Sequence, residues 1–195
     1  MTLERLSRET LPYHPFCLRA DDALFLFIDL QERFVPSIAD ITQVVARAHV
    51  LARGIRALDL PFLVTEQYPR GLGVTLPEIR AALGAVAPIE KTAFSCLRAE
   101  GVCEALARSG RQSVVVVGIE AHVCVLQTVL DLIVAGCGVW VCADAVGSRA
   151  PSDRLTALAQ MDRAGAVVTS VEAVLFELLG DARAEHFREV QAIVK

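Results

Sequence analysis

The sequence predicts an α/β protein: a three-layer αβα sandwich with a central, mostly parallel, doubly wound, Rossmann-like sheet of about six strands. Short apolar runs alternate along the chain with longer segments of helical periodicity, which favours right-handed βαβ units. The apolar runs have few polar interruptions, as in parallel strands that are buried on both faces. Because 195 residues, 54% of them hydrophobic, can bury a full core, we expect residues 1–195 to form a single domain.

In the first part of the chain, one strand, one helix and a second strand are expected in succession. The run "ALFLFIDL" (23–30) is apolar as far as Asp29 and predicts a buried strand. Apolar residues recur at helical spacing over 41–60, and "PFLVTEQ" (61–67) predicts the second strand. The segment 68–79 is rich in glycine and proline, which predicts a long surface loop.

The middle of the chain contains the strongest strand and helix signals. A short strand and a turn are expected in 87–96, followed by a helix over 98–110 that Gly110 ends. The run "QSVVVVG" (112–118) is the most strand-like stretch in the sequence. The segment 122–136 is amphipathic at helical spacing and predicts a long helix.

The last part of the chain repeats the same alternation. "GVWVCAD" (138–144) predicts a strand, and 152–165 predicts a helix with Ser152 as its N-cap. A last strand is expected at 166–170, followed by a helix over 171–180. These elements complete the alternation of strands and helices that a doubly wound sheet requires.

The two ends of the chain are expected to be accessory segments. Residues 1–22 predict an N-terminal arm, and the mixed acidic and basic residues at its start match neither a secretory signal nor a transit peptide. Residues 181–195 predict a C-terminal tail helix that docks through Phe187, Val190 and Val194. Because no apolar stretch is long enough to cross a bilayer, we expect a cytoplasmic protein.

Charge and composition limit the kinds of partner. The net charge is −4, with no long run of one sign, which argues against a nucleic-acid footprint and a membrane-surface patch. The high hydrophobic content suggests apolar surface that a second copy would cover, so we expect a homo-oligomer. The six cysteines are irregularly spaced without a C-x-x-C, and the four histidines form no ligand pattern with them. We therefore expect reduced cysteines and no bound metal.

Three residues at expected strand ends could form one site. In open parallel sheets, ligands bind outside the carboxyl ends of the strands, where Asp29, Lys91 and Cys124 are expected. Taken singly, each has an ordinary explanation: a strand-end cap, a surface lysine paired with Glu90, and a core cysteine. Taken together, they supply the nucleophile, the base and the cation that thiol catalysis requires.

The position of Cys124 favours reactivity. The residue is expected in the first turn of a helix, where unpaired N–H groups and the helix dipole favour thiolate over thiol. We therefore expect a lowered pKa for Cys124. The turn "GIEAH" that precedes it could also present backbone N–H groups as an oxyanion hole.

Three stretches carry a resemblance to a known family. The stretches "FIDLQERF", "EKTAFSC" and "VVGIEAHVCVLQT" contain the three candidate residues. In order and spacing, they resemble the isochorismatase-like cysteine hydrolase superfamily, from about Ala23 to about Leu179. The stretch "VTEQYPRGLGVTLPEI" resembles the subgroup called isochorismatase-domain-containing proteins.

The resemblance implies a catalytic triad. In it, Cys124 is the nucleophile, Asp29 the general base and Lys91 the cation that orients and stabilises them. It also implies a cis peptide bond between Ile119 and Glu120, which would direct the N–H groups of Glu120 and Cys124 into the cleft.

Five further residues are expected to line the substrate pocket: Phe34, Glu66, Gln67, Tyr68 and His122. His122 is expected in its wall rather than in catalysis, because residues two apart on a helix point in different directions. Glu66-Gln67-Tyr68 stands where relatives that hydrolyse nicotinamide carry a metal-binding D-x-H pair. No metal and no cofactor are therefore expected.

The expected function is that of a metal-independent cysteine hydrolase. It would act on a small amide or related C–N bond through an acyl-thioenzyme. Two alternatives stay open: an isochorismatase-type vinyl ether hydrolase, and a noncatalytic scaffold that binds a metabolite or partner. By the resemblance, true isochorismatases carry glycine where this chain has Cys124. A dinucleotide-binding domain is disfavoured because "DLQERF" follows the first strand in place of G-x-G-x-x-G.

Overall fold

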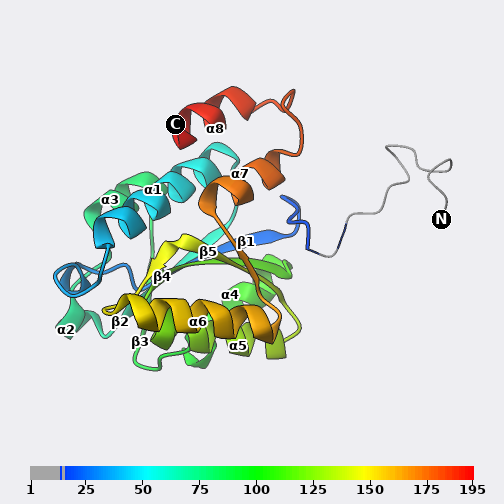
Figure 1. Cartoon of the computed structure of the whole chain (residues 1–195). Coiled ribbons are helices and arrows are strands. Elements are labelled where there is room, and N and C mark those ends of the chain that lie inside the picture. The colour runs from blue at the N-terminus through cyan, green and yellow to red at the C-terminus, as the bar shows by residue number, and fades with distance from the viewer. Residues whose placement is uncertain (1–13, 15) are drawn as a thin grey trace.

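The computed structural model describes residue 14 and residues 16–195, and it has the three expected layers (Figure 1). Of the expected N-terminal arm, residues 1–13 and 15 lie outside the described residues. The central sheet has six strands, all parallel, in the order β3-β2-β1-β4-β5-β6. The fold class predicted from the sequence is confirmed. The strands are β1 (Ala23–Ile28), β2 (Phe62–Gln67), β3 (Ile89–Lys91), β4 (Ser113–Ile119), β5 (Gly138–Gly147) and β6 (Val167–Thr169).

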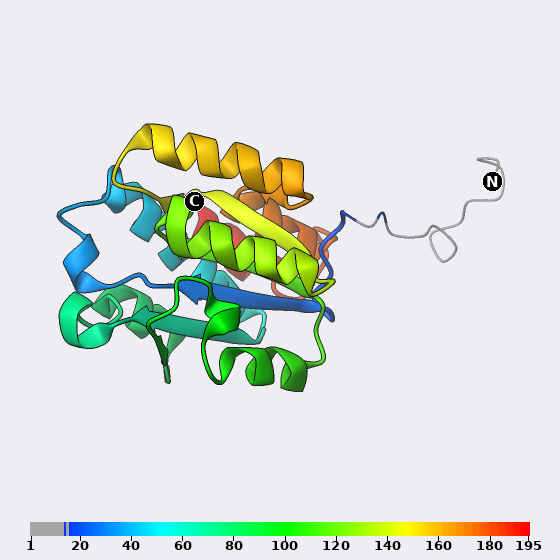
Figure 2. The ribbon, with the colours of Figure 1, turned by 90° about the horizontal axis from the view of Figure 1, so that it is seen from below.

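Helices cover both faces of the sheet (Figures 1 and 2). One face carries α1 (Ile41–Ala57), α3 (Pro77–Leu83), α7 (Val171–Leu179) and α8 (Phe187–Val194). The other face carries α4 (Val102–Ser109), α5 (Leu126–Val134) and α6 (Pro151–Ala164). Among the described residues, no helix is long and apolar enough to span a membrane. Shorter turns are α2 (Pro69–Leu72), η2 (Glu32–Phe34), η3 (Cys96–Arg98) and the π-helical η4 (Ala121–Val125).

The central strand β1 shows why the sheet needs both helical layers. Phe25 and Phe27 join the core beneath α1 and α7, whereas Leu24, Leu26 and Ile28 join the core beneath α5 and α6. Successive side chains of a strand point to opposite faces, so an entirely apolar strand requires cover on both sides. All six residues of β1 are buried.

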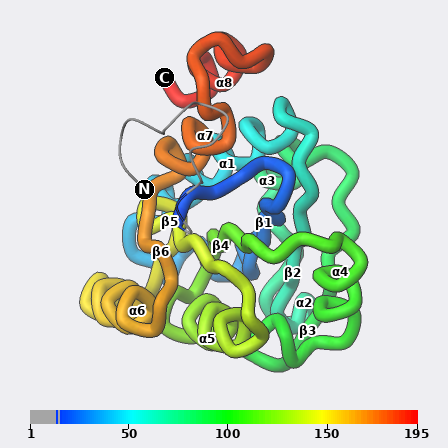
Figure 3. Tube along the Cα trace, turned by 90° about the vertical axis from the view of Figure 1, so that its right-hand side faces the viewer, coloured from blue at the N-terminus to red at the C-terminus, as the bar shows by residue number. Residues whose placement is uncertain are grey.

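The C-terminal tail docks on the molecule's own surface. Helix α8 lies outside α7 and is farther from the sheet, as Figures 1 and 3 show. Its Val190 is fully buried, and Val194 and Phe187 are partly buried, so all three residues expected to dock are at least partly covered.

The segment expected as a loop over 68–79 is partly helical, which corrects the prediction. Helix α2 begins at Pro69 and α3 begins at Pro77. Proline is favoured at the first helical position because its ring presets φ and its missing N–H would have no helical partner there. The pattern of prolines therefore marked helix starts as well as loop residues.

Element ends also differ from expectation. The helix expected from 152 begins at Pro151 with Ala150 at its N-cap, so the assignment of Ser152 as N-cap is wrong. The long helix expected from 122 begins with the π-helical turn η4, and α5 follows it. The first strand ends at Ile28, one residue before Asp29.

The site region lies where the sheet reverses its order. The chain builds β2 and β3 on one side of β1 and then crosses to β4 on the other side. Such a switch point leaves a crevice at the carboxyl ends of the two central strands. Gly118 brings these ends together: its φ is +130°, and a Cβ there would lie 2.0 Å from the carbonyl oxygen of Ile28.

We predict that Gly118→Ala destabilises the fold by about 3 kcal/mol or more, because strain from positive φ adds to a clash with backbone. Gly136→Ala is the matched control: its φ is +85°, but nothing lies within 4 Å of the added carbon. This control should lose only about 1–2 kcal/mol. Denaturant unfolding of both variants measures the difference. Equal losses of unfolding free energy in the two variants would show that the close approach of β4 to β1 does not add to the cost of a side chain at Gly118.

Candidate active site

Asp29 sits directly after β1 with its carboxylate turned into the protein. Its φ is +51°, a left-handed conformation that aspartate tolerates better than most residues. The residue is 0% exposed. Its Oδ1 accepts a hydrogen bond from Thr65 Oγ1 at 2.8 Å, and its Oδ2 lies 2.6 Å from Lys91 Nζ. Both carboxylate oxygens therefore have protein donors.

Lys91 is the last residue of β3, and its side chain is also completely buried. Besides Asp29, its ammonium donates to Gln67 Oε1 at 2.7 Å and to the carbonyl oxygens of Phe94 and Ala93 at 3.2 and 3.4 Å. A buried ion pair is stable only when hydrogen bonds replace the lost water. The four acceptors around Lys91 meet this condition.

Cys124 completes the group. It lies in η4 at the end of β4 and is 4% exposed. Its thiol is close enough to the carboxylate of Asp29 and to the ammonium of Lys91 for both to change its pKa. The structure thus brings Asp29, Lys91 and Cys124 together in one buried cluster, here called the trio.

The electrostatics of the trio overturn the expected thiolate. Burial, and next the negative charge of Asp29, raise the pKa of Cys124 above its ordinary value, against the opposing effect of Lys91. The expectation of a lowered pKa is therefore wrong, because desolvation outweighs the helix end. The protein at rest holds Cys124 as a neutral thiol.

The pair beside Cys124 keeps its charges. Burial is the largest single effect and lowers the pKa of Lys91, but Asp29, Cys96 and Cys124 together raise it by more, so the net shift is upward. Burial raises the pKa of Asp29, and Lys91 and Thr65 oppose that rise. With an ammonium 2.6 Å from one oxygen and a hydroxyl donor on the other, we assign Asp29 as the carboxylate.

Two threonines and a second cysteine support the trio, and sequence reasoning missed all three. Thr65 Oγ1 donates to Asp29. Thr128 Oγ1 donates to the carbonyl of Cys124 at 2.6 Å and accepts from the backbone N–H of Cys96 at 2.9 Å. Burial, and next Asp29, raise the pKa of Cys96 to about 11. Only Thr65 had a signal in the sequence, because it lies in the predicted strand 61–67. In the structure it pairs with Ile28, the residue before Asp29.

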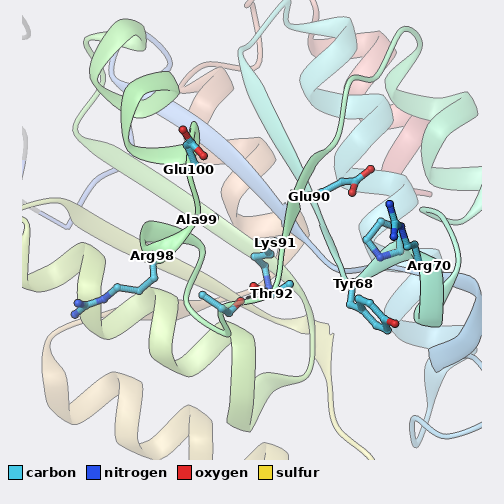
Figure 4. Close-up of a pocket in the computed structure, with 10 residues that line it drawn as sticks. Tyr68, Arg70, Glu90, Lys91, Thr92, Arg98, Ala99 and Glu100 are labelled. Carbon is cyan, nitrogen blue, oxygen red and sulfur yellow. Dashed lines mark hydrogen bonds between the residues drawn. The ribbon is translucent and has the colours of Figure 1, made fainter.

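A pocket of about 480 Å³ opens beside Lys91 (Figure 4). Figure 4 shows Tyr68 and Arg70 on one side of Lys91, with Arg98 and Glu100 on the other. The guanidinium of Arg98 is bound by Asp131, with Nε–Oδ2 and Nη2–Oδ1 distances of 2.9 and 3.1 Å. The pocket therefore combines three basic and two acidic side chains around the end of β3. Those that are charged or aromatic are Tyr68, Arg70, Glu90, Lys91, Arg98 and Glu100.

Of the five residues expected in the pocket wall, Tyr68 lines this pocket. Gln67 is turned inward to Lys91. Glu66 Oε1 accepts from both the N–H and the hydroxyl of Thr75 at 2.7 Å. Phe34 packs against the core beneath α1.

His122, the fifth of these residues, contacts the segment after β5. Its Nδ1 lies 3.0 Å from Ser148 Oγ, and its Nε2 lies 3.8 Å from Asp153 Oδ2. Glu120 makes a second link to this segment, because its Oε1 accepts from Arg149 Nε at 2.8 Å. Together these contacts tie the residues before Cys124 to the end of β5.

The turn that precedes Cys124 has a cis peptide bond between Ile119 and Glu120. The carbonyl of Glu120 accepts from the N–H groups of Val123 and Val125 at 3.0 and 3.2 Å. The N–H groups of Glu120 and Cys124 stay the predicted oxyanion donors. Among the described residues, no group of three or more His, Cys, Asp or Glu side chains is placed to hold a metal ion.

The fold and the trio define a class: a doubly wound α/β domain with a buried thiol, carboxylate and ammonium at the switch point of its sheet. The model of the isochorismatase domain matches residues 23–173, and the chain belongs to the isochorismatase family. The resemblance expected from the sequence is thereby confirmed.

Similar proteins cover almost the whole chain. Isochorismatase domain-containing protein 2A of Mus musculus is 43% identical over 175 residues, which are 90% of this chain and 84% of that protein. A structure described as MAR1 ribonuclease from Caenorhabditis elegans is 39% identical, covers 91% of each chain and has a TM-score of 0.86. YcaC from Pseudomonas aeruginosa, solved with hexane-2,5-diol and covalent acrylamide, is 26% identical, covers 93% of each chain and also has a TM-score of 0.86.

We predict that Cys96 makes the protein sensitive to alkali. Because its pKa rises from 9.0 to about 11 on folding, its contribution to stability is complete below pH 9.0 and is lost as the pH rises to about 11. Between pH 8.5 and 10.5, the wild type should lose about 2 kcal/mol more unfolding free energy than Cys96→Ser. Cys17→Ser, at an exposed position, is the control and should lose as much as the wild type. If the unfolding free energies of the wild type and Cys96→Ser fell equally with pH, the raised pKa of Cys96 would be contradicted.

Proposed function

We propose that this protein is a metal-independent cysteine hydrolase that cleaves a small amide or related C–N bond through an acyl-thioenzyme. The observation that carries the proposal is the buried ion pair between Asp29 and Lys91, 2.6 Å apart and near enough to the thiol of Cys124 to change its pKa. A carboxylate, an ammonium and a thiol are the base, cation and nucleophile of acyl transfer.

The first step transfers a proton within the trio. Asp29 accepts the proton of the Cys124 thiol as the sulfur attacks the substrate carbonyl carbon and a C–S bond forms. Before the transfer, the trio carries one negative and one positive charge, and after it the thiolate replaces the carboxylate. The net charge does not change, so activation avoids a large desolvation penalty although the site excludes water.

The remaining steps reuse the same groups. The carbonyl oxygen becomes an oxyanion, for which the N–H groups of Glu120 and Cys124 are the proposed donors. Asp29 then gives its proton to the leaving amine as the C–N bond breaks. A water molecule attacks the thioester with Asp29 as base, releasing the acid and returning the proton to Cys124. Lys91 stays protonated throughout and stabilises each anion in turn.

A small substrate fits the dimensions of the site. The pocket beside Lys91 measures about 480 Å³, and the trio itself is almost fully buried. The covalent acrylamide in the Pseudomonas aeruginosa relative is a small amide that reacts with nucleophiles, which supports a reactive group in the shared fold. The name of the Caenorhabditis elegans relative suggests RNA instead, but the net charge of −4, with no long run of basic residues, argues against a surface that binds a phosphate chain.

The two alternatives predict different behaviour. A vinyl ether hydrolase of the isochorismatase type would work without a thiol, so Cys124 and its contact with Asp29 would have no role. A noncatalytic scaffold would not need a carboxylate and an ammonium held at 2.6 Å under complete burial, an arrangement that is costly unless it serves a purpose.

Glu66 and Gln67 stand where relatives that hydrolyse nicotinamide carry a metal-binding pair, and in this structure both side chains have other partners. Glu66 holds Thr75, and Gln67 holds Lys91. Activity is therefore proposed to be independent of metal.

Self-association is also proposed. Four large apolar side chains are exposed on segments that follow β1, β2 and β3: Val35, Tyr68, Val74 and Phe94. Exposed apolar side chains in neighbouring segments are typical of surfaces that bind another protein. A second copy of the chain is the proposed partner.

Mass spectrometry tests the nucleophile. On incubation with a panel of small amides and esters, the intact protein should gain an acyl group on Cys124, and Cys124→Ala should gain none. Cys96→Ala is the matched control, since it removes the other buried thiol near Asp29 and should still acylate. An adduct that maps to Cys96, or turnover that survives in Cys124→Ala, would overturn the proposal.

Asp29→Asn should separate thiol reactivity from turnover. Removing the carboxylate removes a charge that raises the pKa of Cys124, so alkylation by iodoacetamide should be as fast as in the wild type or faster. Hydrolysis should fall by about 10²–10⁴-fold because the base is lost. Lys91→Met should slow both reactions. Full hydrolysis by Asp29→Asn would exclude Asp29 as the base.

Light scattering at micromolar concentration tests the assembly. We expect a mass that is a multiple of the 21.0 kDa chain. Replacing Val74 and Phe94 with serine should shift the mass towards the monomer, whereas Val134→Ser, exposed on α5, should not. A monomeric wild type would contradict the proposal.

A further inference from the structure

We propose that Gln67 is a positioning residue that holds the Lys91 ammonium in line with Asp29, and that Gln31 fixes Gln67 in this role. The inference rests on the proposed function of the trio. It adds two buried amides, neither of which is proposed to touch the substrate.

The side chain of Gln67 bridges Lys91 and the chain that follows it. Its Oε1 accepts from Lys91 Nζ at 2.7 Å, and its Nε2 donates to the carbonyl oxygen of Thr92 at 2.8 Å. An ammonium can only donate and a carbonyl can only accept, so these two partners fix which end of the amide faces Lys91. Gln67 is 9% exposed, so water offers little competition for either bond.

Gln31 holds Gln67 through its backbone. Gln31 Oε1 accepts from the N–H of Gln67 at 2.8 Å, and Gln31 Nε2 donates to the carbonyl of Gln67 at 3.0 Å and to that of Gly73 at 2.6 Å. Gln31 is 0% exposed.

The geometry of β1 explains why a side chain takes this place. The strand β1 ends at Ile28, and the left-handed φ of Asp29 turns the backbone away from β2. On the side of β1, the end of β2 thereby has no strand neighbour at Gln67, whereas on the other side Gln67 pairs with Lys91 of β3. The amide of Gln31 supplies the missing acceptor and donor, as a paired strand would.

A neutral amide is the chemistry this position requires. The trio carries one negative and one positive charge, and Gln67 offers Lys91 an acceptor without adding charge. A carboxylate here would compete with Asp29 for the ammonium and would oppose the formation of a thiolate at Cys124. An apolar side chain would leave Lys91 with Asp29 and two carbonyls of its own loop, at Ala93 and Phe94.

A double-mutant cycle with iodoacetamide tests the inference, because this small primary amide reports on both binding and thiol reactivity. For Gln67→Met at pH 8, the maximal rate of Cys124 alkylation should fall about threefold or more, since a displaced ammonium stabilises the thiolate less. The half-saturating concentration should stay within about twofold. In the Lys91→Met background, Gln67→Met should have no further effect, because Gln67 acts through Lys91.

Exposed Gln127, one turn from Cys124 on α5, is the matched control, and Gln127→Met should leave the rate unchanged. If Gln67→Met fails to fold in thermal unfolding, near-isosteric Gln67→Glu replaces it and should also slow alkylation. An effect of equal size with and without Lys91 would show that Gln67 is only structural and would overturn the inference. A wild type whose Cys124 neither alkylates nor acylates would overturn the proposed function instead.

Discussion

The ion pair between Asp29 and Lys91 is the interaction on which the architecture of the site depends. Both side chains are completely removed from water, and such a pair survives only if every lone pair and proton finds a partner. Thr65, Gln67 and two loop carbonyls provide those partners, and they come from β2 and the segment after β3. The order of the sheet makes this possible, because β3, β2 and β1 end side by side at one edge.

The same ion pair influences the protonation state of Cys124, the proposed nucleophile. A lysine alone would favour the thiolate of a neighbouring cysteine, but here burial, and next the carboxylate of Asp29, raise the pKa of Cys124. In the proposed mechanism, the proton therefore stays on the sulfur until a substrate is present. A buried neutral thiol is also less exposed to oxidants and stray electrophiles than a thiolate, which would protect the proposed nucleophile.

Much of this could be predicted from the sequence, for reasons that particular residues make clear. The six parallel strands follow from apolar runs such as 23–28, and the sharing of one edge by Asp29, Lys91 and Cys124 follows from the rule for strand ends. The supporting residues could not be predicted, because the roles of Gln31 and Thr128 depend on register and on where the backbone turns. The ionisation of Cys124 was mispredicted, because burial is a property of the folded chain.

The central claim is that burial and the charge of Asp29 together keep Cys124 protonated at rest, and the ultraviolet absorbance of thiolate measures it directly. The difference spectrum between the wild type and Cys124→Ala should show no thiolate at neutral pH. The difference spectrum between Asp29→Asn and the double variant Asp29→Asn/Cys124→Ala should show a thiolate, because Lys91 then faces Cys124 without a competing carboxylate. A thiolate at Cys124 in the wild type at neutral pH would contradict the account.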